Sequence, residues 1–361
     1  MRVALAVHHA RPTGGHDRYV LELARRLAPR CELDLIAISV AGDLPASVRV
    51  HRVRAPGRPL LVAAPLFRWG ASAAVRDGRY DLVHGIGGAL PGASIVTAQF
   101  CAAEWRRLDR GASVYQRLVA AQAVRDERRT YRHPALKAVI AVSRRTAEEI
   151  ERHYGPLRVP VSVIPNAVDA SVFARRPDDR SAGRPRLLFV GAYERKGLDT
   201  AIRALAAMRH DAELVAIGSG DRARHLALAA ELGVGERVRL EPPRDRIEEA
   251  YAAADAFLFP TRYEPFGMVI AEALASGLPV VTSGVAGAAE LIRDGTSGFI
   301  VADPEDVAGF AAAADRIVGE PGRREAMGRA AREAVRDLTW DIVAARTWDV
   351  YQAALGRAPT K

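Results

Sequence analysis

The sequence has 361 residues and a formal net charge of +9, and hydrophobic and charged residues make up 49% and 26% of it. This length exceeds what one hydrophobic core usually fills and suits two domains, while the composition is that of an ordinary globular protein. No apolar run approaches the roughly 18 residues that a membrane-spanning helix needs, and the first apolar segment, 2–7, is too short for a signal peptide. The two cysteines fit neither a metal motif nor a disulfide framework, so we expect a cytoplasmic protein.

The positive charge is concentrated in the first half of the chain. Residues 1–170 carry 26 Lys and Arg against 15 Asp and Glu, whereas residues 171–361 carry 26 against 28. This asymmetry predicts an anionic partner for the first half, either the inner face of the cell membrane or a phosphorylated acceptor, and arginines crowd residues 105–132 in particular. A solvated arginine-rich surface is an equally good interpretation of the same count. We expect no nucleic-acid partner.

Short β-rich runs alternate with amphipathic stretches along the whole chain. In the first half, strands are expected over 2–7, 33–39, 48–53, 81–84, 94–98 and 137–142, and helices over 16–28, 113–132 and 144–154. In the second half, strands are expected over 186–191, 213–218, 237–241, 256–259, 279–283 and 298–301, and helices over 198–209, 221–232 and 246–254. Such alternation predicts parallel sheets covered by helices on both faces.

The alternation is interrupted once, at 175–186, where Arg, Pro, Asp, Ser and Gly cluster without periodicity, as in a linker. We therefore predict an α/β fold with two doubly wound, Rossmann-like domains, 1–168 and 169–338. The final segment, 339–361, is predicted to be a helix that packs back on the first domain. The carboxyl ends of the strands would face a shared central cleft, since open α/β sheets bind ligands there.

The most informative local feature is the segment 264–272, Glu-Pro-Phe-Gly-Met-Val-Ile-Ala-Glu. Its Pro and Gly mark a turn after strand 256–259, and a helix is expected to follow. The backbone N–H groups at this helix start would suit a diphosphate, and they belong to Phe266, Gly267, Met268 and Val269. Glu264 and Glu272 would accept hydrogen bonds from sugar and ribose hydroxyls. Solvent exposure is the usual alternative for a glutamate, but Glu272 lies in an apolar run where its charge needs a partner.

With Gly277-x-Pro279 and Gly287-x2-Glu290-x3-Asp294 downstream, this segment resembles the retaining glycosyltransferases of family 4, which have the two-domain GT-B fold. Val163-Ile-Pro-Asn-x-Val-Asp169 is similar to that family's entry into the second domain, and 188–197 to its first strand and phosphate-binding loop. The resemblance is strong over about residues 160–305 and looser before them.

The resemblance implies that Glu264 contacts the donor sugar, that Glu272 holds the ribose, and that Arg195 and Lys196 neutralise the diphosphate of a UDP- or GDP-sugar. That donor is a substrate, so no cofactor is expected. Two cations beside a helix start can also stabilise a departing diphosphate without a metal ion. An exposed Arg-Lys turn is the alternative. Ala192 stands where many family members have an Arg.

In the first half, Gly14 and Gly15 follow strand 2–7 and resemble the family's Gly-Gly loop, which faces the donor phosphates. Gln99 stands where the family often has a His; a Gln cannot act as a base, which fits proton transfer to the donor phosphate. His84 is a second candidate, although a histidine in such a position is usually structural. Residues 84–105 are also similar to the lipopolysaccharide-core glucosyltransferases of the family, which favours a glycolipid acceptor.

The expected activity is therefore retaining, metal-independent transfer of a hexose from a nucleotide-diphosphate sugar to a hydroxyl of a glycolipid, a glycan or a small molecule. Two alternatives stay open: a GT-B-type nucleotide-sugar epimerase, and a non-catalytic protein that binds a nucleotide sugar or a lipid. The sequence has no Gly-x-Gly-x-x-Gly after its first strand and no Gly-x4-Gly-Lys-Ser/Thr, which argues against a dehydrogenase and an NTPase.

Overall fold

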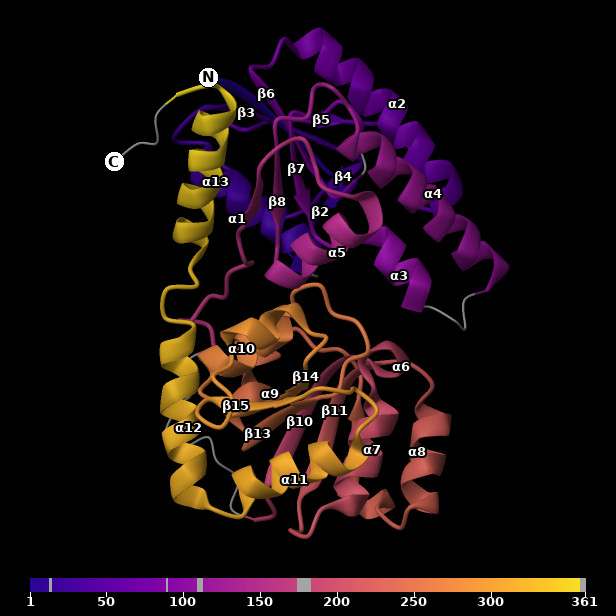
Figure 1. The fold of residues 1–361 in the computed structure, drawn as a ribbon, viewed down its shortest axis with the longest axis vertical. Coiled ribbons are helices and arrows are strands. Elements are labelled where there is room, and N and C mark those ends of the chain that lie inside the picture. Colours follow the sequence, from indigo (N-terminus) through magenta and orange to yellow (C-terminus); the bar gives the residue numbers. More distant parts are fainter. Residues whose placement is uncertain (13–14, 89, 109–112, 174–182, 358–361) are drawn as a thin grey trace. The chain divides into compact units, whose positions relative to one another are not determined.

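The computed structural model describes residues 1–12, 15–88, 90–108, 113–173 and 183–357. Its internal contacts divide the chain into two compact units (Figure 1). Unit 1 consists of Met1–Asn166 and Trp340–Lys361, and unit 2 of Ala167–Thr339. Most of the linker expected over 175–186 lies outside the described residues. Each unit is a parallel α/β sheet with helices around it, which confirms the predicted fold class.

Unit 1 contains a seven-stranded parallel sheet in the order β5-β3-β1-β6-β7-β8-β9. The strands are β1 (Arg2–Ala6), β3 (Glu32–Ala37), β5 (Arg49–Arg52), β6 (Leu82–Ile86), β7 (Ile95–Ala98), β8 (Ala138–Ala141) and β9 (Val161–Val163). Two short strands, β2 (His9–Ala10) and β4 (Ser39–Val40), pair with each other. The helices are α1 (Gly15–Leu27), α2 (Leu60–Gly78), α3 (Ala102–Leu108), α4 (Val114–Tyr131), α5 (Arg144–Tyr154) and α13 (Trp340–Ala354).

The longest of these helices, α2, is absent from the sequence-based prediction. Pro65 and Gly70 lie inside it, and both residue types normally interrupt helices. Its apolar residues also surround the helix axis instead of forming one stripe, so the usual periodic signal is weak. Packing against the sheet compensates: Phe67 and Ala71 of α2 are buried in the core.

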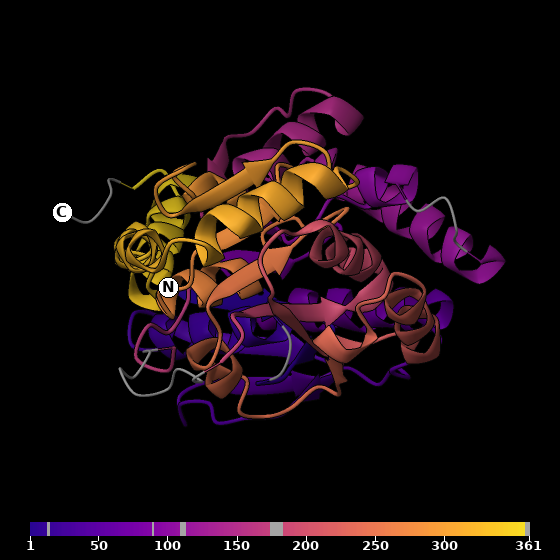
Figure 2. The ribbon, with the colours of Figure 1, turned by 90° about the horizontal axis from the view of Figure 1, so that it is seen from below.

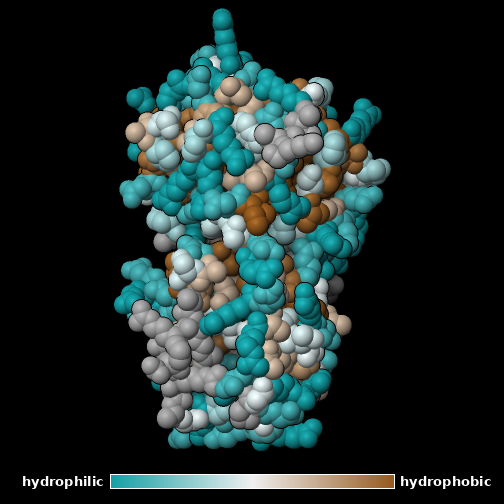
Figure 3. All heavy atoms as spheres, turned by 90° about the vertical axis from the view of Figure 1, so that its left-hand side faces the viewer, coloured by the Kyte–Doolittle hydropathy of each residue, from teal (hydrophilic) through white to brown (hydrophobic). Residues whose placement is uncertain are grey.

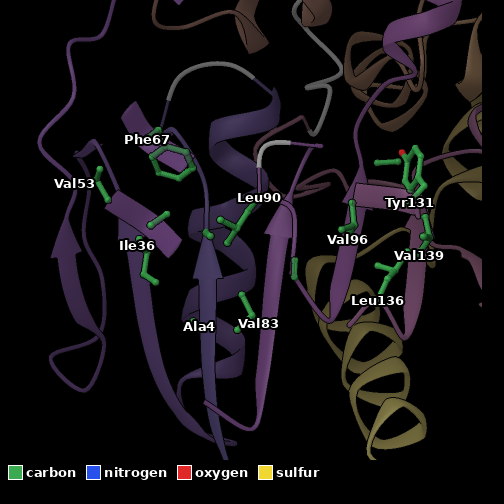
Figure 4. Close-up of a cluster of buried hydrophobic side chains, with 14 of the residues drawn as sticks. Ala4, Ile36, Val53, Phe67, Val83, Leu90, Val96, Tyr131, Leu136 and Val139 are labelled. Atoms are coloured by element: carbon green, nitrogen blue, oxygen red, sulfur yellow. The ribbon is translucent and has the colours of Figure 1, made fainter. Parts of the chain in front are cut away.

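The core on one face of the unit 1 sheet joins strands to α2, α4 and α5. Ala4, Ile36, Val83, Val96 and Val139 point from five strands into this cluster (Figure 4). Because these strands are parallel and have helices on both sides, their alternate residues are buried as well, and the strands are mainly apolar.

On the other face, the C-terminal helix α13 packs against α1 (Figure 1). The phenol of Tyr351 on α13 lies 2.7 Å from His84 Nδ1, and His84 Nε2 lies 2.8 Å from the Thr97 hydroxyl. All three side chains are fully buried, and burial lowers the pKa of His84 to about 3. His84 is therefore a neutral residue that connects α13 to β6 and β7. This is the structural role that the sequence favoured for it.

Unit 2 contains a six-stranded parallel sheet in the order β12-β11-β10-β13-β14-β15. The strands are β10 (Arg186–Ala192), β11 (Glu213–Ser219), β12 (Val238–Glu241), β13 (Ala256–Phe259), β14 (Val280–Ser283) and β15 (Gly298–Val301). The helices are α6 (Tyr193–Lys196), α7 (Leu198–Ala207), α8 (Arg222–Glu231), η1 (Gly235–Arg237), α9 (Glu248–Ala252), α10 (Met268–Ala275), η2 (Gly287–Leu291), α11 (Val307–Val318) and α12 (Pro321–Ala334). They cover both faces of the sheet (Figures 1 and 2).

Both sheets reverse their direction of strand addition at one point. In unit 1, the chain adds β3 and β5 on one side of β1 and β6 onwards on the other side. In unit 2, β11 and β12 lie on one side of β10, and β13 onwards lie on the other. Right-handed crossovers then place the helices before and after the reversal on opposite faces, which leaves a crevice at the carboxyl ends of the two central strands. This topology marks β1/β6 and β10/β13 as the places for ligands.

Within the described residues, no helix combines the length and the apolar character that crossing a bilayer requires. Polar side chains cover most of the face drawn in Figure 3, with small hydrophobic patches among them.

A buried carboxyl group joins three elements of unit 1. Glu127 of α4 accepts hydrogen bonds from the Ala102 N–H at 2.9 Å and from the Tyr154 hydroxyl at 2.5 Å. It thereby connects α4 to the start of α3 and to the end of α5. Burial raises the pKa of Glu127 to about 7, although both hydrogen bonds oppose that shift. The fold therefore retains a group that is half ionised near neutral pH.

We predict that Glu127 makes unit 1 less stable as the pH rises. Its pKa is near 4.3 in the unfolded chain and about 7 in the folded one, so the folded state favours the proton. The contribution of Glu127 to the free energy of unfolding should be highest below pH 4.3, fall up to about pH 7 and then level off. Replacing Glu127 by Gln should remove this slope and stabilise unit 1 at pH 8 by roughly 1–3 kcal/mol.

All four tryptophans lie in unit 1, so urea unfolding followed by tryptophan fluorescence reports on this unit. The exposed Glu148, changed to Gln, provides the control and should keep the wild-type slope. Equal slopes for Glu127→Gln and wild type between pH 4.5 and 7 would contradict the prediction.

Candidate functional site

The reversal point of unit 2 brings together two residues that are 68 positions apart in the sequence. Lys196 is the last residue of α6, which follows β10, and Glu264 lies in the loop after β13. The Lys196 ammonium donates a hydrogen bond to Glu264 Oε2 and lies 3.5 Å from the carbonyl oxygen of Tyr263. Two of the residues singled out in the sequence thus form one ion pair at the expected edge of the sheet.

Lys196 is a buried cation and not part of an exposed turn. Only 4% of the residue is accessible to solvent, and its ammonium lies 5.7 Å from the centre of the Phe259 ring. Burial lowers the pKa of Lys196, while the negative charge of Glu264 acts in the opposite direction. The neighbouring Arg195 is exposed. The two cations therefore differ: Lys196 is held inside the site, and Arg195 lies at the surface.

Two glycines allow the chain to form this site. Gly197 has a φ of +78°, and a Cβ at this position would lie 2.1 Å from the carbonyl oxygen of Pro260. Gly267 has a φ of +105°, and a Cβ there would lie 3.0 Å from Cγ of Glu264. Any other residue would strain the backbone at both positions; at Gly197 it would also push apart the two loops that carry the ion pair, and at Gly267 it would displace the Glu264 side chain.

The loop before α10 is fixed by backbone hydrogen bonds to the loop after β14. The Gly287 N–H donates to the Glu264 carbonyl at 2.8 Å, and the Ala288 N–H donates to the Phe266 carbonyl at 2.6 Å. Helix α10 begins at Met268, so Met268 and Val269 belong to its first turn, where N–H groups have no acceptor within the helix. Phe266 and the N-cap Gly267 precede the helix, so α10 begins directly after the turn that Pro265 and Gly267 were expected to form.

Glu272 has the partner that its apolar surroundings required. The hydroxyl of the fully buried Tyr251 lies 3.1 Å from Glu272 Oε2 and 3.3 Å from the Val269 carbonyl oxygen. Tyr251 therefore orients the carboxylate and also contacts the first turn of α10. The sequence-based prediction missed Tyr251, because it lies in α9, 21 positions before Glu272, and no local pattern connects the two.

Arg262 is a second residue that the sequence-based prediction missed. Its guanidinium donates to the Glu194 carbonyl at 2.7 Å and to both carboxylate oxygens of Asp199 at 2.9 and 3.0 Å. It also donates to Glu305 at 2.5 Å. Arg262 thus joins the loop after β13 to α6 and α7, the elements that position Lys196. An arginine two residues before Glu264, directly after a strand, was the available signal.

In unit 1, Gln99 follows β7 and is paired with Asn166. The Asn166 amide donates to Gln99 Oε1 at 3.2 Å, and the Gln99 amide donates to Asn166 Oδ1 at 3.4 Å. Gly15 is the first residue of α1, whereas Gly14 lies outside the described residues. The Gln99 amide is held in place by its partner, and it can offer hydrogen bonds but no proton transfer.

The arrangement in unit 2 combines a buried ammonium, two oriented carboxylates and the start of a helix. A ligand with a doubly charged group and several hydroxyls would satisfy all of them. The described part of the chain contains no group of three or more His, Cys, Asp or Glu side chains placed to bind a metal ion.

Comparison with known families assigns both halves of the chain. Residues 13–172 match the model of a family described as Glycosyltransferase Family 4, and residues 184–320 match one described as Glycosyl transferases group 1.

Known proteins give the same assignment. A D-inositol 3-phosphate glycosyltransferase of Xylanimonas cellulosilytica is 30% identical, over 100% of this chain and 98% of its own. A glycogen synthase of Mycobacterium tuberculosis is 36% identical over 60% of this chain and 54% of its own.

Among solved structures, the lipopolysaccharide-biosynthesis glycosyltransferase WaaG superimposes with a TM-score of 0.82 at 24% identity, covering 96% of this chain and 99% of its own. Anabaena HepE, solved with UDP and glucose, gives 0.72 at 19% identity, covering 98% and 100%. The chain therefore belongs to the family 4 glycosyltransferases and has their GT-B fold.

Proposed function

We propose that unit 2 binds a nucleotide-diphosphate sugar, with a UDP- or GDP-sugar favoured, and that the enzyme transfers its hexose with retention of configuration. The buried Lys196–Glu264 pair is the observation that carries this proposal. A desolvated ammonium at a crevice of the sheet gains from a strong anion, and a diphosphate provides one. The UDP and glucose in the HepE structure support a donor of this class.

In this proposal, each group contacts one part of the donor. Lys196 binds the diphosphate, with Arg195 at the surface and the first-turn N–H groups of α10 adding positive charge. Glu264 accepts hydrogen bonds from sugar hydroxyls, and Glu272 accepts them from the ribose, held by Tyr251. Because these groups compensate the charge of the departing diphosphate, transfer requires no metal ion and its rate should be insensitive to a chelator.

The chemical step breaks the bond between the anomeric carbon and the diphosphate oxygen. An acceptor hydroxyl attacks the same face of the sugar, and its proton moves to the departing phosphate oxygen. Gln99 positions the reactants by hydrogen bonding and does not remove the proton, since an amide is not a base at neutral pH.

The two free cysteines, Cys31 and Cys101, are compatible with the reducing cytoplasm as the compartment of this enzyme.

Replacing Lys196 by Ala should lower kcat by about 100-fold or more, because the departing diphosphate loses its buried cation. The measurement is transfer from UDP-glucose, GDP-mannose and related donors to a hydroxyl acceptor, with product anomers assigned by proton NMR. Arg203→Ala, an exposed cation on α7, is the matched control and should keep full activity.

Lys196→Met, which retains the aliphatic stem, separates catalysis from folding when circular dichroism and thermal unfolding are recorded for both variants. A folded Lys196→Met variant with wild-type turnover would contradict the assignment. Donor turnover that is independent of any acceptor would instead indicate an epimerase.

Replacing Tyr251 by Phe should raise the donor KM by roughly 5- to 10-fold and change kcat by less than about twofold. The substitution removes the hydroxyl that orients Glu272, and a contact made equally in the ground and transition states affects KM alone. Tyr193→Phe is the matched control, since Tyr193 is also buried in unit 2 but donates to the Glu241 carbonyl. A change in kcat without a change in KM would argue against a ribose-holding role for Glu272.

We also propose that unit 1 contacts an anionic membrane through α2 and α4, which lie side by side. Exposed apolar side chains follow one stripe of α2 and the start of α4: Val62, Leu66, Trp69, Val114, Tyr115 and Leu118. Trp69 is 75% exposed and Val114 74%. Exposed arginines lie further along α4. Apolar insertion combined with arginines beside the headgroups is typical of helices that lie in the membrane interface.

Sedimentation with vesicles tests this contact. Binding to phosphatidylglycerol vesicles should exceed binding to phosphatidylcholine vesicles and weaken with added salt. The double variant Trp69→Ser, Val114→Ser should bind at least about tenfold more weakly, because two large apolar side chains no longer insert. Ile342→Ser, an exposed apolar residue of α13, is the control. Undiminished binding of the double variant would exclude this surface.

A further inference from the structure

Unit 1 contains a pocket of about 210 Å³ between α2, α4 and the carboxyl ends of its strands. Its walls are mainly apolar, formed by Leu60, Ala64, Ile86, Phe100, Val119 and Ala123. Leu60 and Ala64 are one turn apart on α2, and Val119 and Ala123 are one turn apart on α4, so each helix presents one side to the pocket.

The pocket lies where the topology of unit 1 predicts a ligand. His8 follows β1, and Gly87 follows β6, and both contribute to its lining. These are the two strands at the reversal point of the sheet. Phe100 is the neighbour of Gln99, the residue that we place near the transferred group. A molecule in this pocket would thus lie beside the loop that carries Gln99.

The charges in the wall do not suit a phosphorylated ligand. Arg68, the only guanidinium among the described lining residues, is paired with Asp126, and Glu127 adds a second carboxyl group. The described lining therefore offers a phosphate neither a lysine nor an unpaired arginine. Two further polar side chains line the pocket, His8 and Gln122, and Gln122 Nε2 is buried with no hydrogen-bond partner among the described residues. The pocket is thus suited to a hydrocarbon group with one hydrogen-bond acceptor, such as an ether or ester oxygen.

We propose that this pocket holds the hydrocarbon part of the acceptor, so that the enzyme glycosylates a lipid-like or otherwise apolar alcohol and not a phosphorylated polyol. The proposal rests on the proposed function, because it names the acceptor of that reaction. It separates this chain from the relatives whose name specifies D-inositol 3-phosphate. The same two helices carry the exposed apolar residues of the proposed membrane contact, which fits an acceptor that is delivered from a bilayer.

Two glucosides that differ only in their apolar group test the proposal. Octyl β-glucoside, kept below its micelle-forming concentration, should bind the wild-type protein at least about tenfold more tightly than methyl β-glucoside in calorimetric titrations, since a few buried methylenes suffice for that gain. It should also be the better acceptor in transfer assays. D-inositol 3-phosphate should bind no better than methyl β-glucoside.

Ala64→Phe and Ala123→Phe fill the pocket from its two helices and should each abolish the advantage of the octyl chain. Ala73→Phe adds the same ring to α2 outside the pocket lining and should leave that advantage unchanged. UDP binding, measured in parallel, should be equal in all four proteins. Equal affinity of the wild-type protein for the two glucosides, or an octyl advantage that survives both filled variants, would overturn the proposal. If the wild-type protein binds no UDP but still prefers octyl β-glucoside to methyl β-glucoside, the donor assignment is wrong and the pocket assignment stands.

Discussion

The ion pair between the Lys196 ammonium and the Glu264 carboxylate is the interaction on which the proposed donor site depends. Removing two charges from water costs several kcal/mol per ion, and their mutual attraction repays this only with good geometry. Here the geometry is set by Gly197, Gly267 and Arg262, none of which needs to contact a ligand. If positions 196 and 264 served stability alone, well-packed apolar residues could replace the ion pair. The retained buried pair therefore points to binding, because a partner anion improves the environment of Lys196 in a way that folding does not require.

In both units the crevice lies where the order of strands reverses, but one crevice is charged and the other is apolar. At β10/β13 of unit 2 the crevice holds a buried cation, carboxylates and a helix start. At β1/β6 of unit 1 the described lining of the crevice is mainly apolar, and its one arginine, Arg68, is neutralised by Asp126. This difference corresponds to the two substrates of a glycosyltransferase, one a charged nucleotide and the other an alcohol whose character varies among family members. In our proposals, the charged crevice binds the donor and the apolar crevice binds the acceptor.

The sequence predicted the elements of unit 2 well because strand and helix patterns there are short, periodic and separated by glycines and prolines. It also predicted that Glu272 needs a partner, since a charge in the run Ile270–Leu274 is costly. It could not name that partner, because Tyr251 meets Glu272 only after α9 and α10 pack together. Helix α2 was missed because Pro65 and Gly70 both have low helix propensity. The helix forms all the same, because Phe67 packs into the core and this packing outweighs the low propensity. With α2 missed, the pocket that it lines was beyond prediction from the sequence.

The relatives of this chain bear names that specify acceptors as different as an inositol phosphate and glycogen. Similarity to both cannot determine the acceptor, because the two compounds share only hydroxyl groups. The lining of unit 1 is more informative, since a phosphate requires cations that are not already paired, and a polysaccharide requires many hydrogen-bonding groups. The described lining has neither: its arginine, Arg68, is paired, and His8 and Gln122 are its polar side chains besides the two carboxyl groups. By elimination on chemical grounds, an apolar group is the ligand that this wall can desolvate without leaving a charge unsatisfied.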